Sequence, residues 1–158
     1  DIRQPLRIII DSQHRVQATA KIFTLPGQVV IVSPKAPLKK ISSQYCDVSY
    51  LETPQQIGDN SSQVNLTSLL ALLAKQGVNE VLVETGAKLA GAFIEQNLVD
   101  ELVLFTAPTL LGSDARPAFN LPFTKMNQQI RWSWHDVRMV GNDLKLVLKS
   151  QIGLNEKS

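Results

Sequence analysis

One carboxylate, Glu84, is placed where chemistry could occur: it follows a run, residues 78–83, that ends in Val-Leu-Val, and it precedes Gly86 by two positions. The run predicts a buried strand, and residues 86–97 predict a helix. A carboxylate at the end of such a strand could accept hydrogen bonds from ligand hydroxyls or ring nitrogens, because open sheets bind ligands there. The glycine turn and the helix N-terminus could hold a phosphate. The pattern fits a helix-capping carboxylate and a plain turn equally well.

Two familiar phosphate-binding motifs are excluded at this turn. Gly86 and Gly91 have the spacing of the glycines of a P-loop. However, Ala92 and Phe93 stand where that loop needs a lysine and then a serine or threonine. The chain also has no Gly-x-Gly-x-x-Gly fingerprint. The sequence therefore gives no support to NTP hydrolysis or to an ordinary Rossmann site.

The other polar candidates are weaker. Asp11 and Ser12 follow an apolar run at 6–10 and suit either a turn or a site at the end of a strand. His14 and His135 lie far apart, with no cysteine or carboxylate at ligand spacing, so we expect no metal site. No serine lies in a nucleophile elbow, and the sequence identifies no catalytic residue.

The elements that would position these residues alternate between strand and helix. The first half predicts strands at 6–10, 27–32 and 48–51, and a helix from the N-cap Asn65 to Gly77. After the strand and helix described above comes a strand at 99–106. The last part predicts an antiparallel hairpin of 130–137 with 143–148 around Gly141 and Asn142. This order predicts an α/β fold with a mainly parallel sheet and a C-terminal antiparallel hairpin.

Composition places the chain among ordinary globular domains. Its 158 residues suit one domain, expected at 1–150 with a tail at 151–158. The net charge of +2 is spread along the chain, which disfavours nucleic-acid binding, and no apolar run approaches the length of a membrane span. Cys46 is the only cysteine, so a disulfide or a cysteine-based zinc site is excluded within the chain. We expect a soluble, cytoplasmic protein.

Four blocks of sequence together resemble the C-terminal reductase domain of the bifunctional deaminase/reductase of riboflavin biosynthesis. The blocks are 7–16, 83–89, 93–102 and 107–116. They occur in the order of that family and spread over most of the chain. The most specific are Val-Asp-Glu-Leu at 99–102 and Pro-x-Leu-Leu-Gly at 108–112.

The resemblance implies a fold similar to dihydrofolate reductase, a three-layer sandwich, and a reaction that uses NADPH. The implied reaction reduces the ribosyl side chain of 5-amino-6-(5-phosphoribosylamino)uracil to the ribityl form. Glu84 resembles a substrate contact, and Ser12 resembles a cofactor contact. The segment that resembles the binding site for the cofactor phosphates consists of Gly86, Ala87, Lys88, Leu89, Ala90, Gly91 and Ala92. The resemblance also implies an N-terminal zinc deaminase domain in the full-length protein, and we expect a homodimer.

The chain departs from the family pattern in two respects. Thr85 stands where the family usually has glycine or alanine. The strand and loop with which the family's reductase domain begins, and the zinc deaminase signature, are absent, so we expect a domain truncated at its N-terminus and inactive as a deaminase. Two alternatives remain. One is a non-catalytic dimerisation or ligand-binding module, with Trp132 and Trp134 as anchors, and the other is a related pterin or pyrimidine reductase.

Overall fold

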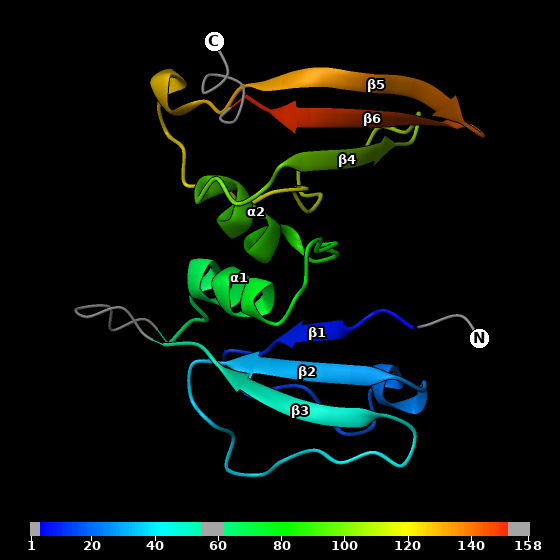
Figure 1. Cartoon of the computed structure of the whole chain (residues 1–158). Coiled ribbons are helices and arrows are strands. Elements are labelled where there is room, and N and C mark those ends of the chain that lie inside the picture. Colours follow the sequence, from blue (N-terminus) through cyan, green and yellow to red (C-terminus); the bar gives the residue numbers. More distant parts are fainter. Residues whose placement is uncertain (1–3, 55–61, 152–158) are drawn as a thin grey trace. The chain divides into compact units, whose positions relative to one another are not determined.

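The computed structural model describes residues 4–54 and 62–151, and the chain divides into two compact units, Asp1–Glu80 and Val81–Ser158 (Figure 1). Within these described ranges, each unit contains one three-stranded sheet and one α-helix. The first sheet is parallel and the second antiparallel, so the chain is an α/β protein, as predicted. No helix within the described residues is long and apolar enough to cross a membrane.

The sheet of the first unit has the order β1-β2-β3, with strands Arg7–Ile10, Gln28–Ser33 and Asp47–Glu52. All three strands run parallel, which confirms the pairing expected for this half of the chain. The central strand β2 is the most buried because it is covered on both faces; Val29 and Val32, which point to opposite faces, are both fully buried. Phe23 and Cys46 pack with Val29 and Ile31 in the core of this unit.

The connection from β1 to β2 contains a single turn of 3-10 helix, η1, at Lys21–Thr24. Arg7, the first residue of β1, holds this connection through its guanidinium group. Nη1 donates to the carbonyl of Ile22 at 2.7 Å, and Nη2 donates to those of Leu25 and Pro26 at 2.9 Å each. These charge-assisted bonds satisfy carbonyls that a short helix leaves unpaired at its C-terminal end.

Helix α1, Leu66–Lys75, begins and ends as its sequence predicts. The side chain of Asn65 accepts a hydrogen bond from the backbone N–H of Ser68, which makes Asn65 the N-cap. Leu66, Leu69 and Leu73 form the buried stripe of the helix. Gly77 follows the C-terminus with φ +82, a conformation that glycine adopts without steric cost.

The strand predicted at 78–83 is absent from the structure, so that prediction was wrong for the chain as described. These residues have no regular structure and belong to neither sheet. Val81 and Val83 are each 41% exposed, and Leu82 is 83% exposed. The apolar residues at 81–83 suit a strand. A strand also needs a neighbouring strand for its backbone hydrogen bonds, and hydrophobicity alone does not identify that neighbour.

The second unit begins with helix α2, Ala87–Glu95, which confirms the predicted helix. Its sheet has the order β4-β6-β5, with strands Glu101–Thr106, Asp143–Ser150 and Trp132–Val140 (Figure 1). A short 3-10 helix, η2, lies at Met126–Gln128. Strand β4 pairs antiparallel with β6, whereas the alternation of strand and helix had favoured a parallel neighbour.

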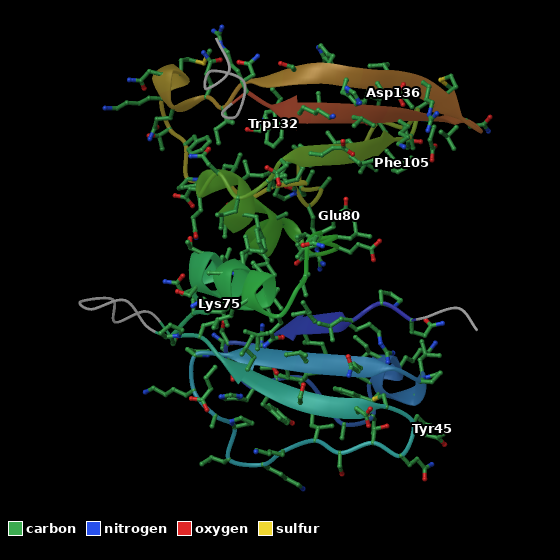
Figure 2. The ribbon with its side chains drawn as sticks, viewed as in Figure 1. Tyr45, Lys75, Glu80, Phe105, Trp132 and Asp136 are labelled. Carbon is green, nitrogen blue, oxygen red and sulfur yellow. The ribbon has the colours of Figure 1, made fainter. Side chains whose placement is uncertain are left out.

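Strands β5 and β6 form the predicted hairpin. Val140 pairs with Asp143, so the loop is the two residues Gly141 and Asn142, and Gly141 has φ +61 as such tight loops require. A bulge between Trp134 and Asp136 leaves His135 outside the pairing (Asp136 is labelled on β5 in Figure 2). Because of the bulge, one face of β5 carries four apolar residues, Trp132, Trp134, Val137 and Met139.

Candidate cofactor and substrate site

The N-terminus of α2 presents backbone N–H groups that have no hydrogen-bond partner among the described residues. Gly86 is the N-cap residue, with φ −81 and ψ 168, and no side chain caps the helix. The first bond of the helix runs from the N–H of Ala90 to the carbonyl of Gly86 at 3.1 Å. Within the described residues, the N–H groups of Ala87, Lys88 and Leu89 therefore have no partner. Unpaired N–H groups at the positive end of a helix dipole suit an anion such as a diphosphate.

The structure separates the stretch predicted to bind cofactor into two parts. The three residues just described offer free donors, but the N–H groups from Ala90 onward are used inside the helix. Gly91 has a packing role as well. A Cβ at this position would lie 2.1 Å from the carbonyl oxygen of Asn120, so only glycine leaves room for the loop there. The amide of Asn120 donates to the carbonyl of Ala87 at 3.0 Å and holds that loop against the helix.

The contact between α2 and Asn120 was missed at the sequence level. A signal for it was present, because a glycine inside a helix is costly unless another backbone approaches closely at that point. Gly91 satisfies this condition, and it is buried. What the sequence could not supply is the identity of the approaching segment, which lies 29 positions further along the chain.

Glu84 lies two residues before the N-cap of α2 and is exposed. Its carboxylate has no hydrogen-bond or ion-pair partner in the part of the chain that the structure describes. The alternative in which Glu84 caps the helix is therefore not realised, since the helix has no side-chain cap. A solvent-facing carboxylate beside an uncapped helix N-terminus remains available to a ligand. Its predicted role as a substrate contact remains a prediction.

Ser12, the other predicted cofactor contact, belongs to the first unit and follows β1 directly. Its hydroxyl oxygen accepts a hydrogen bond from the backbone N–H of Val64 at 3.1 Å. The hydroxyl proton has no acceptor within the described residues, so Ser12 can still donate to a ligand. The two histidines, His14 and His135, are exposed, and the described residues include no cluster of three or more metal-ligating side chains.

Comparison with known proteins places the chain in a class, the RibD proteins of riboflavin biosynthesis. The solved structure of RibD from Acinetobacter baumannii (form 1) matches with a TM-score of 0.76 and 36% sequence identity, over 92% of this chain and 37% of that one. It has the same arrangement of a parallel three-stranded sheet and an antiparallel C-terminal sheet.

The particular family follows from the sequence: residues 1–146 match the model of the RibD C-terminal domain, and the chain belongs to that family. It is 36% identical over 146 residues to the riboflavin biosynthesis protein RibD of Haemophilus influenzae, covering 92% of this chain and 37% of that protein. It is 28% identical over 150 residues to the 5-amino-6-(5-phosphoribosylamino)uracil reductase of Buchnera aphidicola, covering 68% of that protein. The resemblance stated from the four sequence blocks is confirmed.

Proposed function

We propose that this chain is the NADPH-dependent reductase domain that converts the ribosyl side chain of 5-amino-6-(5-phosphoribosylamino)uracil to the ribityl form. One observation carries the proposal: a helix N-terminus without a side-chain cap lies two residues after Glu84, and within the described residues three of its N–H groups and the Glu84 carboxylate have no partner. Membership of the RibD C-terminal family supports it. When bound, NADPH supplies the hydride that adds to C1 of the ribosyl group as the ring C1–O bond opens and its oxygen takes up a proton.

The residues at the start of α2 fit a dinucleotide cofactor. A diphosphate carries its charge on oxygens that accept hydrogen bonds, and Ala87, Lys88 and Leu89 present N–H donors at the positive end of the helix. The exposed ammonium group of Lys88 adds a positive charge next to these donors. The family resemblance also assigns the Ser12 hydroxyl to the cofactor, and its proton has no acceptor among the described residues. In this assignment Ala90, Gly91 and Ala92 support the turn and do not donate to the phosphates themselves.

Glu84 is assigned to the substrate. Its carboxylate can accept hydrogen bonds from the hydroxyls of the ribosyl chain or from the N–H groups of the pyrimidine. Such bonds fix the acceptor carbon in place, and correct placement supplies much of the rate enhancement in reactions of this kind.

We further infer the finer features that the family resemblance implies. The two sheets belong to one reductase domain at 1–150 with the three-layer sandwich of dihydrofolate reductase, and the protein is cytoplasmic. The family resemblance also implies an N-terminal zinc deaminase domain in the full-length protein, whereas this chain spans 37% of its RibD relative from Haemophilus influenzae. The exposed apolar face of β5 supports a homodimer; Trp134 is 67% exposed there and Met139 is 64% exposed.

Two substitutions in the full-length protein that carries this chain test the proposed function. Ala87→Pro removes one free N–H where proline is tolerated, because Ala87 is the first residue of α2 and Gly86 before it is extended. Loss of a bond to a charged group costs about 1.5 kcal/mol or more, so NADPH should bind at least about tenfold more weakly. The KM for the pyrimidine should stay unchanged.

Glu84→Gln should show the converse: a raised KM for the pyrimidine and an unchanged dissociation constant for NADPH. Glu95→Gln is the matched control, because Glu95 is an exposed glutamate at the last residue of the same helix. Absence of NADPH binding by the unmodified protein would refute the proposed function. Equal loss of cofactor and substrate affinity in Glu84→Gln would contradict the role given to that residue.

A further inference from the structure

The carboxylate of Asp11 is nearly buried, at 8% exposed, and lies just beyond the C-terminal end of β1. Oδ1 accepts a hydrogen bond from the N–H of Arg15 at 2.9 Å, and Oδ2 accepts one from the N–H of Val16 at 2.8 Å. No cation pairs with it among the described residues. A buried carboxylate is costly unless its oxygens are satisfied, and here two backbone amides satisfy them.

These bonds give the loop after β1 a defined shape. The N–H of Asp11 donates to the carbonyl of Val32 at 2.8 Å, which extends the pairing of β1 with β2 by one residue. The carbonyl of Asp11 accepts from the N–H of His14 at 3.3 Å, and His14 adopts φ +52, which is uncommon outside glycine. Residues 11–16 therefore close around one carboxylate, and the turn presents Ser12.

Ser12 is held at a second point as well. Its hydroxyl oxygen accepts from the amide of Val64, 52 positions away, and Val64 is 7% exposed. Val64 immediately precedes the N-cap of α1, so this bond ties the turn to the start of that helix. With the oxygen fixed between the turn and Val64, the hydroxyl proton is the part of Ser12 left for a ligand.

We propose that Asp11 is a positioning residue for cofactor binding, acting through Ser12. This inference rests on the proposed function, in which Ser12 donates to the cofactor. Asp11 does not contact the cofactor itself, because both of its oxygens are occupied by backbone amides and the residue is nearly buried. It sets the loop geometry that directs the Ser12 hydroxyl.

Asp11→Asn tests this in the full-length protein. Asparagine has the same shape, but its NH₂ group would face one of the two backbone N–H donors, so one bond is lost and the turn loosens. We expect the dissociation constant for NADPH to rise about tenfold. The KM for the pyrimidine and kcat at saturating NADPH should be unchanged. Asp11→Ser, which keeps one acceptor oxygen, replaces the asparagine variant if that variant does not fold.

A double-mutant cycle with Ser12→Ala separates positioning from a general loss of stability. If Asp11 acts through Ser12, the double variant should bind NADPH as weakly as Ser12→Ala alone. Ser43→Ala is the matched control in the same unit. The Ser43 hydroxyl donates to the carbonyl of Phe23 at 2.7 Å and accepts from the amide of Tyr45 at 3.0 Å. Its loss should lower the unfolding temperature without changing NADPH affinity.

These measurements distinguish a failure of the positioning role of Asp11 from a failure of the proposed function. Multiplicative losses in the cycle, or unchanged NADPH affinity in Asp11→Asn, would overturn the positioning role while the proposed function stands. Unchanged NADPH affinity in Ser12→Ala, together with weakened NADPH binding in Ala87→Pro, would also overturn the positioning role of Asp11, because Ser12 would then not contact the cofactor. Failure of the unmodified protein to bind NADPH would instead refute the proposed function, and this inference with it.

Discussion

Replacing Gly91 by alanine introduces one methyl group where the backbone of Asn120 lies close against α2. The new Cβ would lie 2.1 Å from the carbonyl oxygen of Asn120, 2.9 Å from its carbonyl carbon and 3.2 Å from its nitrogen. These atoms are backbone, so no side-chain rotation can relieve the overlap. Either α2 or the loop at Asn120 must move by about 1 Å to reach an ordinary contact. The movement should break the bond from the Asn120 amide to the Ala87 carbonyl.

Two destabilising contributions and one stabilising contribution determine how far Gly91→Ala changes the free energy of unfolding. Overpacking of this kind costs about 1–3 kcal/mol, and loss of the hydrogen bond costs about 1 kcal/mol more. Alanine is favoured over glycine inside a helix by about 1 kcal/mol, which offsets part of the cost. We therefore expect Gly91→Ala to lower the free energy of unfolding by about 1–3 kcal/mol.

Hydrogen exchange locates the change, because the Asn120 amide should lose its protection while the amides of β5 and β6 keep theirs. Gly86→Ala is the matched control. It adds the same methyl group at the N-cap of the same helix, where nothing lies within 4 Å, so only the capping preference changes. A Gly91→Ala protein with unaltered stability and a protected Asn120 amide would show that the loop does not pack against α2 as described.

Three further substitutions have defined outcomes. Asn65→Ala removes the cap bond to Ser68 and should cost about 1 kcal/mol, seen as faster exchange in the first turn of α1; unchanged exchange would contradict the cap. Gly141→Ala forces alanine to φ +61, so the unfolding temperature should fall by an amount equivalent to about 1–2 kcal/mol; an unchanged temperature would argue against this loop geometry. Trp134→Ser should convert the proposed homodimer to monomer in sedimentation with the fold intact, because the side chain is exposed; a persistent dimer would place the interface elsewhere.

Local signals in the sequence predicted the helices and the hairpin well. The Asn65 cap and the stop at Gly77 delimit α1, and Gly86 begins α2, because caps and helix periodicity depend on neighbours along the chain. The hairpin loop at Gly141 and Asn142 is equally local, and it confirms the predicted turn. Glu84 and Ser12 can be selected as candidates from the sequence, because each is a polar residue just after a strand-like run, and their roles stay predictions.

Pairing between distant segments could not be predicted in the same way. β4 is an apolar run that suits either direction, and its antiparallel partner β6 begins 37 residues after β4 ends. The run at 78–83 looks like a strand by composition alone, yet it has no place in either sheet. Two further contacts depend on backbone geometry, which hydrophobic periodicity does not report. They are the approach of the Asn120 carbonyl to Gly91 and the hydrogen bonds of two backbone amides to Asp11.

The bulge at His135 has an evolutionary consequence. Trp134 pairs with Leu148 and Asp136 pairs with Val147, so the two neighbours of His135 already occupy consecutive rungs of the ladder. Loss of this one residue would leave every other pair in register and every side chain of β5 on its present face. Elsewhere in the strand, a one-residue deletion would move every following side chain to the opposite face of the sheet. Related hairpins can therefore differ in length by one residue at this position, and alignments should admit a gap here.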